Sequence, residues 1–122
     1  MNFDFNNCSW HDSIIKNIFI DRSDPGNVDT VEMTIDWYDE PASKIIFKDV
    51  YLFKATLNFG IIADETILNA GIAIQEDPDL INFYQKAKGV LASKKINCYI
   101  IETNSTGGTI KILAETVEKI LL

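Results

Sequence analysis

Histidine, arginine and cysteine are scarce in this chain, whose 122 residues include one histidine, one arginine and two cysteines. Metal-dependent phosphohydrolases built on a His-Asp pair need further histidine ligands, so a single histidine excludes that class. Cys8 and His11 are three residues apart, but the sequence holds no second closely spaced pair of ligands for a zinc ion. We therefore predict no metal site and no cofactor.

A secretory signal and long apolar runs are also missing. The N-terminal stretch MNFDFNNCSW has neither the basic region nor the apolar region of a signal peptide. No apolar run approaches the roughly 20 residues that cross a bilayer as a helix. We therefore expect a cytoplasmic protein in which Cys8 and Cys98 are reduced. The sequence leaves a bridge between them open.

The remaining composition is typical of a globular protein. Hydrophobic residues make up 47% of the chain and charged residues 24%, which argues against disorder. No linker, internal repeat or low-complexity segment interrupts the sequence. Residues 1–122 are therefore expected to form one domain with a core that needs neither a disulfide nor a structural metal.

The charge of the chain is unevenly distributed. Residues 1–40 hold nine acids and two bases, whereas residues 41–122 hold nine of each, so the first third carries the whole net charge of −7. Such a surface repels nucleic acid and anionic lipid, and we predict that neither is a partner. It would attract a basic protein.

Alternating apolar residues and turn-forming residues predict a mostly antiparallel, curved or barrel-like sheet of about six to seven strands. We expect bulges near Lys16-Asn17 and Lys48-Asp49, where the alternation fails. One amphipathic helix over residues 78–94 packs on this sheet, with Asp77 as its N-cap. The fold class is therefore α+β. The strands are expected at residues 14–21, 30–38, 44–53, 55–62, 66–75, 96–103 and 109–117.

His11 and Asp12 stand next to Ser13 and near Ser9, which are the residue types of a nucleophilic triad. Successive side chains on a strand diverge, so these neighbours cannot generally meet in triad geometry. The S-x-x-K pattern from Ser13 to Lys16 lacks the accompanying elements of serine β-lactamases. We interpret His11, Asp12 and Ser13 as a structural motif that bonds the backbone at the entry to the first strand. We predict no catalytic residue.

The acidic segment between Ser23 and Ser43 holds six acids and no base. One interpretation is a solvated face that keeps the protein soluble. The other is a docking surface for a basic protein, with Tyr38 or Tyr51 as an aromatic anchor if it is exposed. Trp37 is expected in the core. The candidate partner-binding residues are Asp24, Asp29, Glu32, Asp36, Asp39 and Glu40.

The stretch WHDSIIKNIFID at residues 10–21 resembles the start of a group of small bacterial proteins. Their pattern continues with a strand like VEMTIDW and an element like IIFKDV, both present here within the first 50 residues. Many members are uncharacterised, and some resemble immunity proteins of polymorphic-toxin or contact-dependent-inhibition systems. No shared catalytic site comes with the resemblance. The matching residues are His11, Asp12, Ser13, Ile15, Ile18, Ile20, Phe47 and Val50.

These observations lead to one principal hypothesis and two alternatives. The principal hypothesis is a non-enzymatic protein-binding module, an immunity protein that neutralises a cognate toxin domain through its acidic surface. The first alternative is a structural or small-ligand-binding domain whose acidity serves solubility. The second is an enzyme that uses His11 and Asp12.

Overall fold

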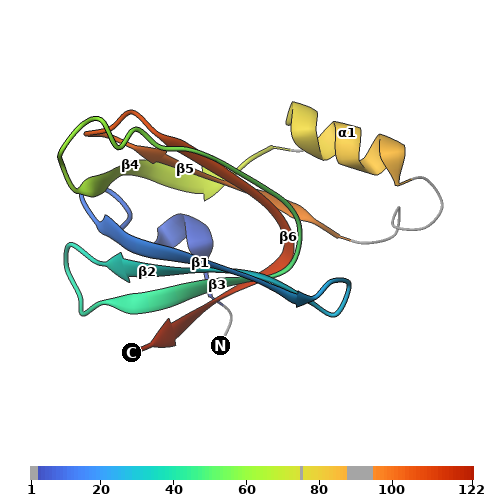
Figure 1. Ribbon diagram of the computed structural model, residues 1–122, viewed down its shortest axis with the longest axis horizontal. Coiled ribbons are helices and arrows are strands. Elements are labelled where there is room, and N and C mark those ends of the chain that lie inside the picture. The colour runs from blue at the N-terminus through green and yellow to red at the C-terminus, as the bar shows by residue number, and fades with distance from the viewer. Residues whose placement is uncertain (1–2, 75, 88–94) are drawn as a thin grey trace.

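The computed structural model describes residues 3–74, 76–87 and 95–122. In these ranges it shows six antiparallel strands in one closed barrel and one α-helix outside it (Figure 1). The predicted α+β class and barrel-like sheet are confirmed. The strand order around the barrel is β1-β2-β3-β6-β5-β4. The elements are η1 (Phe5–Asn7), β1 (Ile14–Asp24), β2 (Val28–Asp36), β3 (Ser43–Thr56), β4 (Glu65–Ile72), α1 (Pro78–Lys86), β5 (Asn97–Thr103) and β6 (Thr109–Leu121).

Strands β3 and β6 form the frame of the barrel. They pair from Ser43–Leu121 to Thr56–Thr109 along their whole length, and in Figure 1 both curve round one side of the molecule. Asp49 has a positive φ of 53°, and the register slips between Val50 and Leu52. The predicted bulge near Lys48-Asp49 is therefore confirmed, and it bends β3 from one layer of the barrel into the other.

Strand β1 closes the barrel through a short contact. It pairs with β2 along most of its length, with a register slip between Ile15 and Asn17 that confirms the predicted bulge. On its other edge only Ile14 and Ile15 pair with β4. The closing seam is thus two residue pairs long, and β1 and β4 diverge beyond it.

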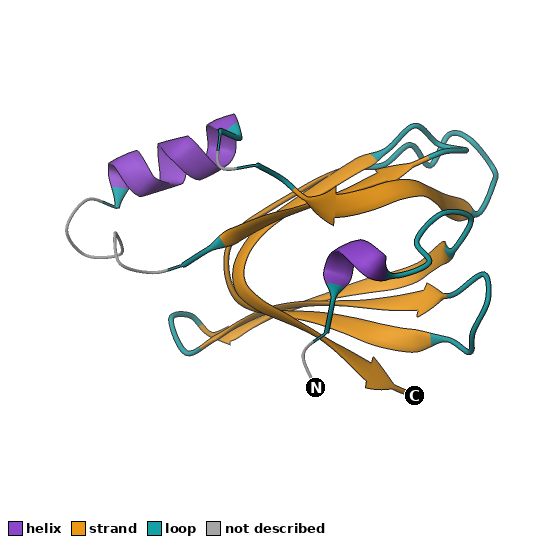
Figure 2. Cartoon of the chain, turned by 180° about the vertical axis from the view of Figure 1, so that it is seen from behind, coloured by secondary structure: helices purple, strands orange, loops and turns teal. Residues whose placement is uncertain are grey.

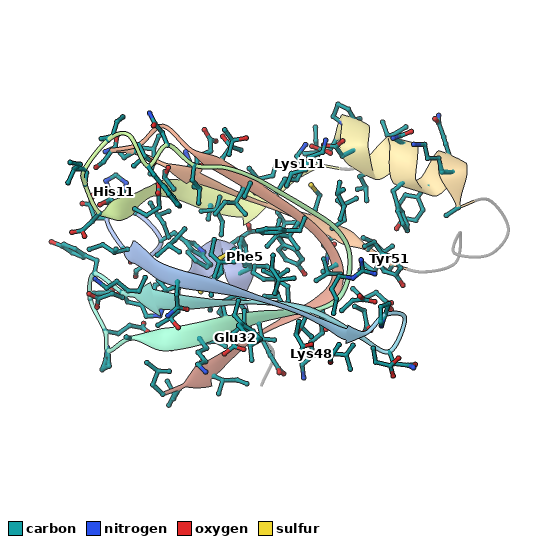
Figure 3. The ribbon with its side chains drawn as sticks, in the orientation of Figure 1. Phe5, His11, Glu32, Lys48, Tyr51 and Lys111 are labelled. Atoms are coloured by element: carbon teal, nitrogen blue, oxygen red, sulfur yellow. The ribbon has the colours of Figure 1, made fainter. Side chains whose placement is uncertain are left out.

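The N-terminal segment fills the interior that this divergence leaves open. Phe5 of η1 is 1% exposed, and its ring contacts Trp10, Phe47 and Tyr99 at centroid distances of 4.7, 6.1 and 4.9 Å. The side chain of Asn6 accepts a hydrogen bond of 2.9 Å from the backbone N–H of Ile72 in β4. Figures 2 and 3 show η1 and Phe5 between the two layers of the barrel.

Helix α1 projects from one end of the barrel (Figure 1) and packs there against β3, β5 and β6. Leu80 is buried with Cys98 and Leu113 in a second apolar cluster. The predicted start is confirmed, since Asp77 accepts hydrogen bonds from the N–H groups of Asp79 and Leu80. The helix ends at Lys86, and residues 88–94 of the predicted helix lie outside the described ranges. In those ranges no helix has the length and apolar character to cross a membrane.

The predicted strand over residues 55–62 is wrong. Residues 55 and 56 complete β3, and residues 57–64 form a loop. This loop bonds to itself, because Asn58 accepts hydrogen bonds from the N–H groups of Gly60 and Ile61. The apolar composition of this segment predicted a β-strand. Its backbone groups are instead hydrogen-bonded locally, so they do not pair with a neighbouring strand.

Candidate functional site

The turn before β1 is built around Ser13, which is fully buried. Its hydroxyl donates a hydrogen bond of 2.6 Å to the carbonyl oxygen of Ser9 and accepts one of 2.9 Å from the backbone N–H of Tyr38. Its carbonyl oxygen accepts from the N–H of Ile67 at 2.7 Å. Ser13 therefore joins the N-terminal turn, the β2–β3 loop and β4.

His11 bonds backbone, but its partner lies in β4 and not, as predicted, at the entry to the first strand. Its Nδ1 lies 2.8 Å from the carbonyl oxygen of Leu68, and because a carbonyl oxygen only accepts, Nδ1 carries the hydrogen. Nε2 lies 3.5 Å from Oδ1 of Asp12. Asp12 has a positive φ of 67°, and its backbone N–H donates to the carbonyl oxygen of Ile67 at 2.9 Å.

These hydrogen bonds do not form a nucleophilic triad. The hydroxyl of Ser13 is buried with both of its partners in the backbone, and the hydroxyl of Ser9 donates to the carboxylate of Asp39 at 2.8 Å. Nδ1 of His11 is occupied by Leu68. The arrangement can hold a turn against a strand, but neither hydroxyl is directed at an imidazole nitrogen that would remove its proton.

The two cysteines are free thiols in different parts of the structure. Cys8 packs against the barrel core and Cys98 lies under α1. Burial raises the pKa of Cys8, and burial raises the pKa of Cys98 to about 11. Both groups are therefore protonated and poorly nucleophilic at neutral pH. The described residues contain no cluster of three or more metal-ligating side chains.

Three of the six candidate acids are paired with bases. Asp29 accepts from Arg22 at 2.8 Å, and Glu32 lies 2.7 Å from Nζ of Lys44. Glu40 pairs with a third base, Lys119. The pairing bases come from β1, β3 and β6, so the acidic segment is partly neutralised by strands that flank it in space.

The other three acids have neutral partners or none in the described part of the chain. Asp24 accepts from the side chain of Asn27 at 2.9 Å, Asp39 accepts from Ser9, and the carboxylate of the exposed Asp36 has no hydrogen-bonding or ionic partner among the described residues. Their positions differ. Asp24 lies at the β1–β2 turn, whereas Asp36 and Asp39 lie at the opposite end of β2, about 26 Å away at the usual strand rise.

The end of the barrel that carries Asp36 and Asp39 is formed by residues 8–13, 37–42, 57–64 and 104–108, and we call it the loop end (Figure 1). Apolar side chains are exposed there: Tyr38 is 74% exposed, Phe59 84% and Ile62 100%. Trp37 is buried in the core, as predicted. Phe59 and Ile62 were not predicted to be exposed, because the apolar run over residues 55–62 predicted a strand there.

A cavity of about 330 Å³ opens near the other end, where β2 and β3 separate. It lies between the β1–β2 hairpin and the second half of β3. Its floor includes the core residue Val31 and the partly buried Val50 and Phe53, and the Arg22–Asp29 ion pair lies at its edge. Tyr51 lines it as well, with its hydroxyl donating to Glu115 at 2.6 Å.

Comparisons with protein-family models, with curated proteins and with solved structures found no match to this chain.

Proposed function

We propose that this chain is a non-enzymatic protein-binding module, an immunity protein that neutralises a bacterial toxin domain by binding it through the loop end. The observation that carries the proposal is the exposed Tyr38 at the start of the β2–β3 loop, which is flanked in the sequence by Asp36 and Asp39. Neither carboxylate is paired with a base within the described residues. A basic partner would supply the missing cations.

The loop is held in place before any partner binds. The N–H of Tyr38 donates to the buried hydroxyl of Ser13, and Asp39 accepts from Ser9. A preorganised loop loses little conformational entropy on binding. Tyrosine is among the residues most enriched at binding hot spots, and carboxylates around it would steer a basic partner and fix its orientation.

A small-ligand-binding domain is the second candidate function. The observation in its favour is the cavity between β2 and β3, whose volume of about 330 Å³ lies at the lower end of the range for ligand sites. Its apolar floor and its charged edge would suit a small amphipathic molecule.

The test begins with the gene beside this one. The proposal expects a large secreted protein with a variable C-terminal domain, and that domain should be toxic when expressed alone. Co-expression of this chain should protect the cells, and the two purified proteins should bind each other. An unprotected cell, or purified proteins that do not associate, would contradict the proposal.

A charge-removal variant then tests the surface. Asp36→Asn combined with Asp39→Asn should slow association with the toxin domain about tenfold at low salt and flatten its salt dependence, because steering is lost. Asp21→Asn combined with Asp24→Asn removes the same charge at the β1–β2 turn and is the matched control. If both double variants slowed association equally, the loop end would not be the binding surface.

A further inference from the structure

The outer edge of β1 has no partner strand among the described residues once β1 leaves β4. Pairing on that edge stops at Ile15, while β2 continues to pair on the other edge as far as Asp24. Between the register slips of β1, residues 17–21 pair with β2 without interruption. This five-residue stretch therefore presents regular backbone N–H and C=O groups that another strand can bond.

The side chains of this stretch are unusually apolar for an edge. Phe19 is 59% exposed and Ile20 is 52% exposed. Edge strands are commonly protected from association by lysine, by proline or by a bulge. Here Lys16 and Arg22 stand just outside residues 17–21, at the two slips, and the stretch itself contains neither base nor proline.

The stretch Asn-Ile-Phe-Ile-Asp is nearly symmetric about Phe19. We infer that two copies of the chain associate by antiparallel pairing of their β1 edges, with a two-fold axis through Phe19. This register places Phe19 opposite Phe19 of the second copy and Ile18 opposite Ile20, on matching faces. Asn17 then lies opposite Asp21, so its amide can donate to that carboxylate.

The charges around this edge agree with self-pairing. Lys16 and Arg22 are the only bases among the first 40 residues, and both belong to β1. The two-fold axis brings Lys16 of each copy beside the acidic β1–β2 turn of the other. Arg22 of one copy lies opposite Lys16 of the other. Because Arg22 is paired with Asp29 at 2.8 Å, its repulsion of that lysine is reduced.

Five pairs of residues make a small interface, of the size found in weak and reversible complexes. We therefore expect the dimer fraction of the purified chain to rise with concentration in sedimentation-velocity measurements. Phe19→Lys places two ammonium groups on the axis and should leave a monomer throughout the series. Phe59→Lys adds the same charge at an exposed loop position and is the control, which should still dimerise.

Substitutions at the exposed Asn17 test the register without changing the core, and the exposed Gln85 supplies the control. Asn17→Lys should strengthen the dimer severalfold, since the new ammonium faces Asp21 of the second copy, whereas Asn17→Asp should weaken it. Gln85→Lys and Gln85→Glu make equivalent charge changes on α1 and should leave association nearly unchanged. Circular dichroism would verify that each variant is folded.

Three results would overturn the inference. The wild-type chain could sediment as a monomer at every concentration, Phe19→Lys could dimerise like the wild type while folded, or the Asn17 variants could behave like the Gln85 variants. If Phe59→Lys alone abolished the dimer, self-association would belong to the loop end.

Discussion

At the residue scale, Ser13 contributes more to the turn before β1 than the exposed His11 does. Its side chain satisfies one backbone acceptor, at Ser9, and one backbone donor, at Tyr38, in a site without solvent access. His11 bonds Leu68 from a side chain that is 66% exposed, where water can replace a lost partner. Within the His-Asp-Ser motif, Ser13 is therefore the residue that holds the turn in place.

Ser13→Ala should lower the free energy of unfolding by about 1–3 kcal/mol, because it leaves buried backbone groups without partners. Urea denaturation followed by tryptophan fluorescence would measure the change. Ser105→Ala, at an exposed turn position, is the control and should have little effect. A cost for Ser13→Ala no larger than that of the control would show that water replaces both hydrogen bonds.

Tyr51 should keep its phenol proton to unusually high pH. The hydrogen bond to Glu115, followed by burial, raises the pKa of Tyr51 to about 12. Because this raised pKa favours the protonated phenol in the folded state, its stabilisation is complete below the ordinary pKa near 10 and is lost as pH rises towards 12. Ultraviolet absorbance titration should show a phenol that ionises near pH 12, and Tyr51→Phe should remove that step.

At the element scale, an ion-pair cluster holds the start of α1 against β6. Nζ of Lys111 lies 2.9 Å from Asp77 and 2.9 Å from Asp79. Burial opposes ionisation of Asp77, but the hydrogen bonds from Lys111 and the helix N–H groups outweigh it and lower its pKa. Hydrogen bonds from Lys54 and then Lys111 lower the pKa of Asp79. The capping residue of the helix is thus also its attachment to the barrel.

Acid should therefore weaken the attachment of α1. A carboxylate with a lowered folded-state pKa stabilises the fold above its unfolded value near 4, and this contribution disappears as pH falls through the folded value. Lys111→Met should reduce stability at pH 7 and flatten its dependence on pH below 4, as measured by urea denaturation. Lys48→Met breaks only the exposed pair with Glu118 and should cost no more than about 1 kcal/mol. An unchanged acid profile in Lys111→Met would contradict this account.

At the scale of the whole molecule, the barrel combines a long, continuous ladder with a short closing seam. β3 and β6 pair over nearly their full lengths, whereas β1 and β4 pair at only two positions. The seam depends on the N-terminal segment, whose Asn6, Asp12 and Ser13 all bond β4. Barrel closure is therefore the least secured part of the sheet.

Native-state hydrogen exchange should reproduce this order. Amides in the centre of the β3–β6 ladder should exchange only by global unfolding, and amides in the β1–β4 seam should exchange earlier by local opening. Phe5→Ala should speed hydrogen exchange at the β1–β4 seam by more than the loss of global stability predicts. The reason is that Phe5 fills the interior beside this seam. Equal protection in the seam and in the ladder would contradict this division.

The candidate site was only partly predictable. Residue type and local charge density pointed to the six acids as candidates and to a bond between His11 and the backbone, but not to Leu68 as its partner. The sequence did not reveal that Arg22, Lys44 and Lys119 pair with half of these acids, since all three bases lie outside the acidic segment and meet it only in the folded barrel. It also missed the exposed Phe59, since an apolar run has the same composition in a strand and in a loop.

The sequence by itself determined the local features: the alternating strands, the bulges near Lys16 and Asp49, and the Asp77 cap of α1. Each of these depends on residues close together in the chain. Only the tertiary structure decided that β3 pairs with β6, that Phe5 fills the barrel, and that the acids divide between two ends of the molecule. Those outcomes depend on which distant segments share a face of the sheet. A local sequence pattern does not specify the pairing energies between distant segments.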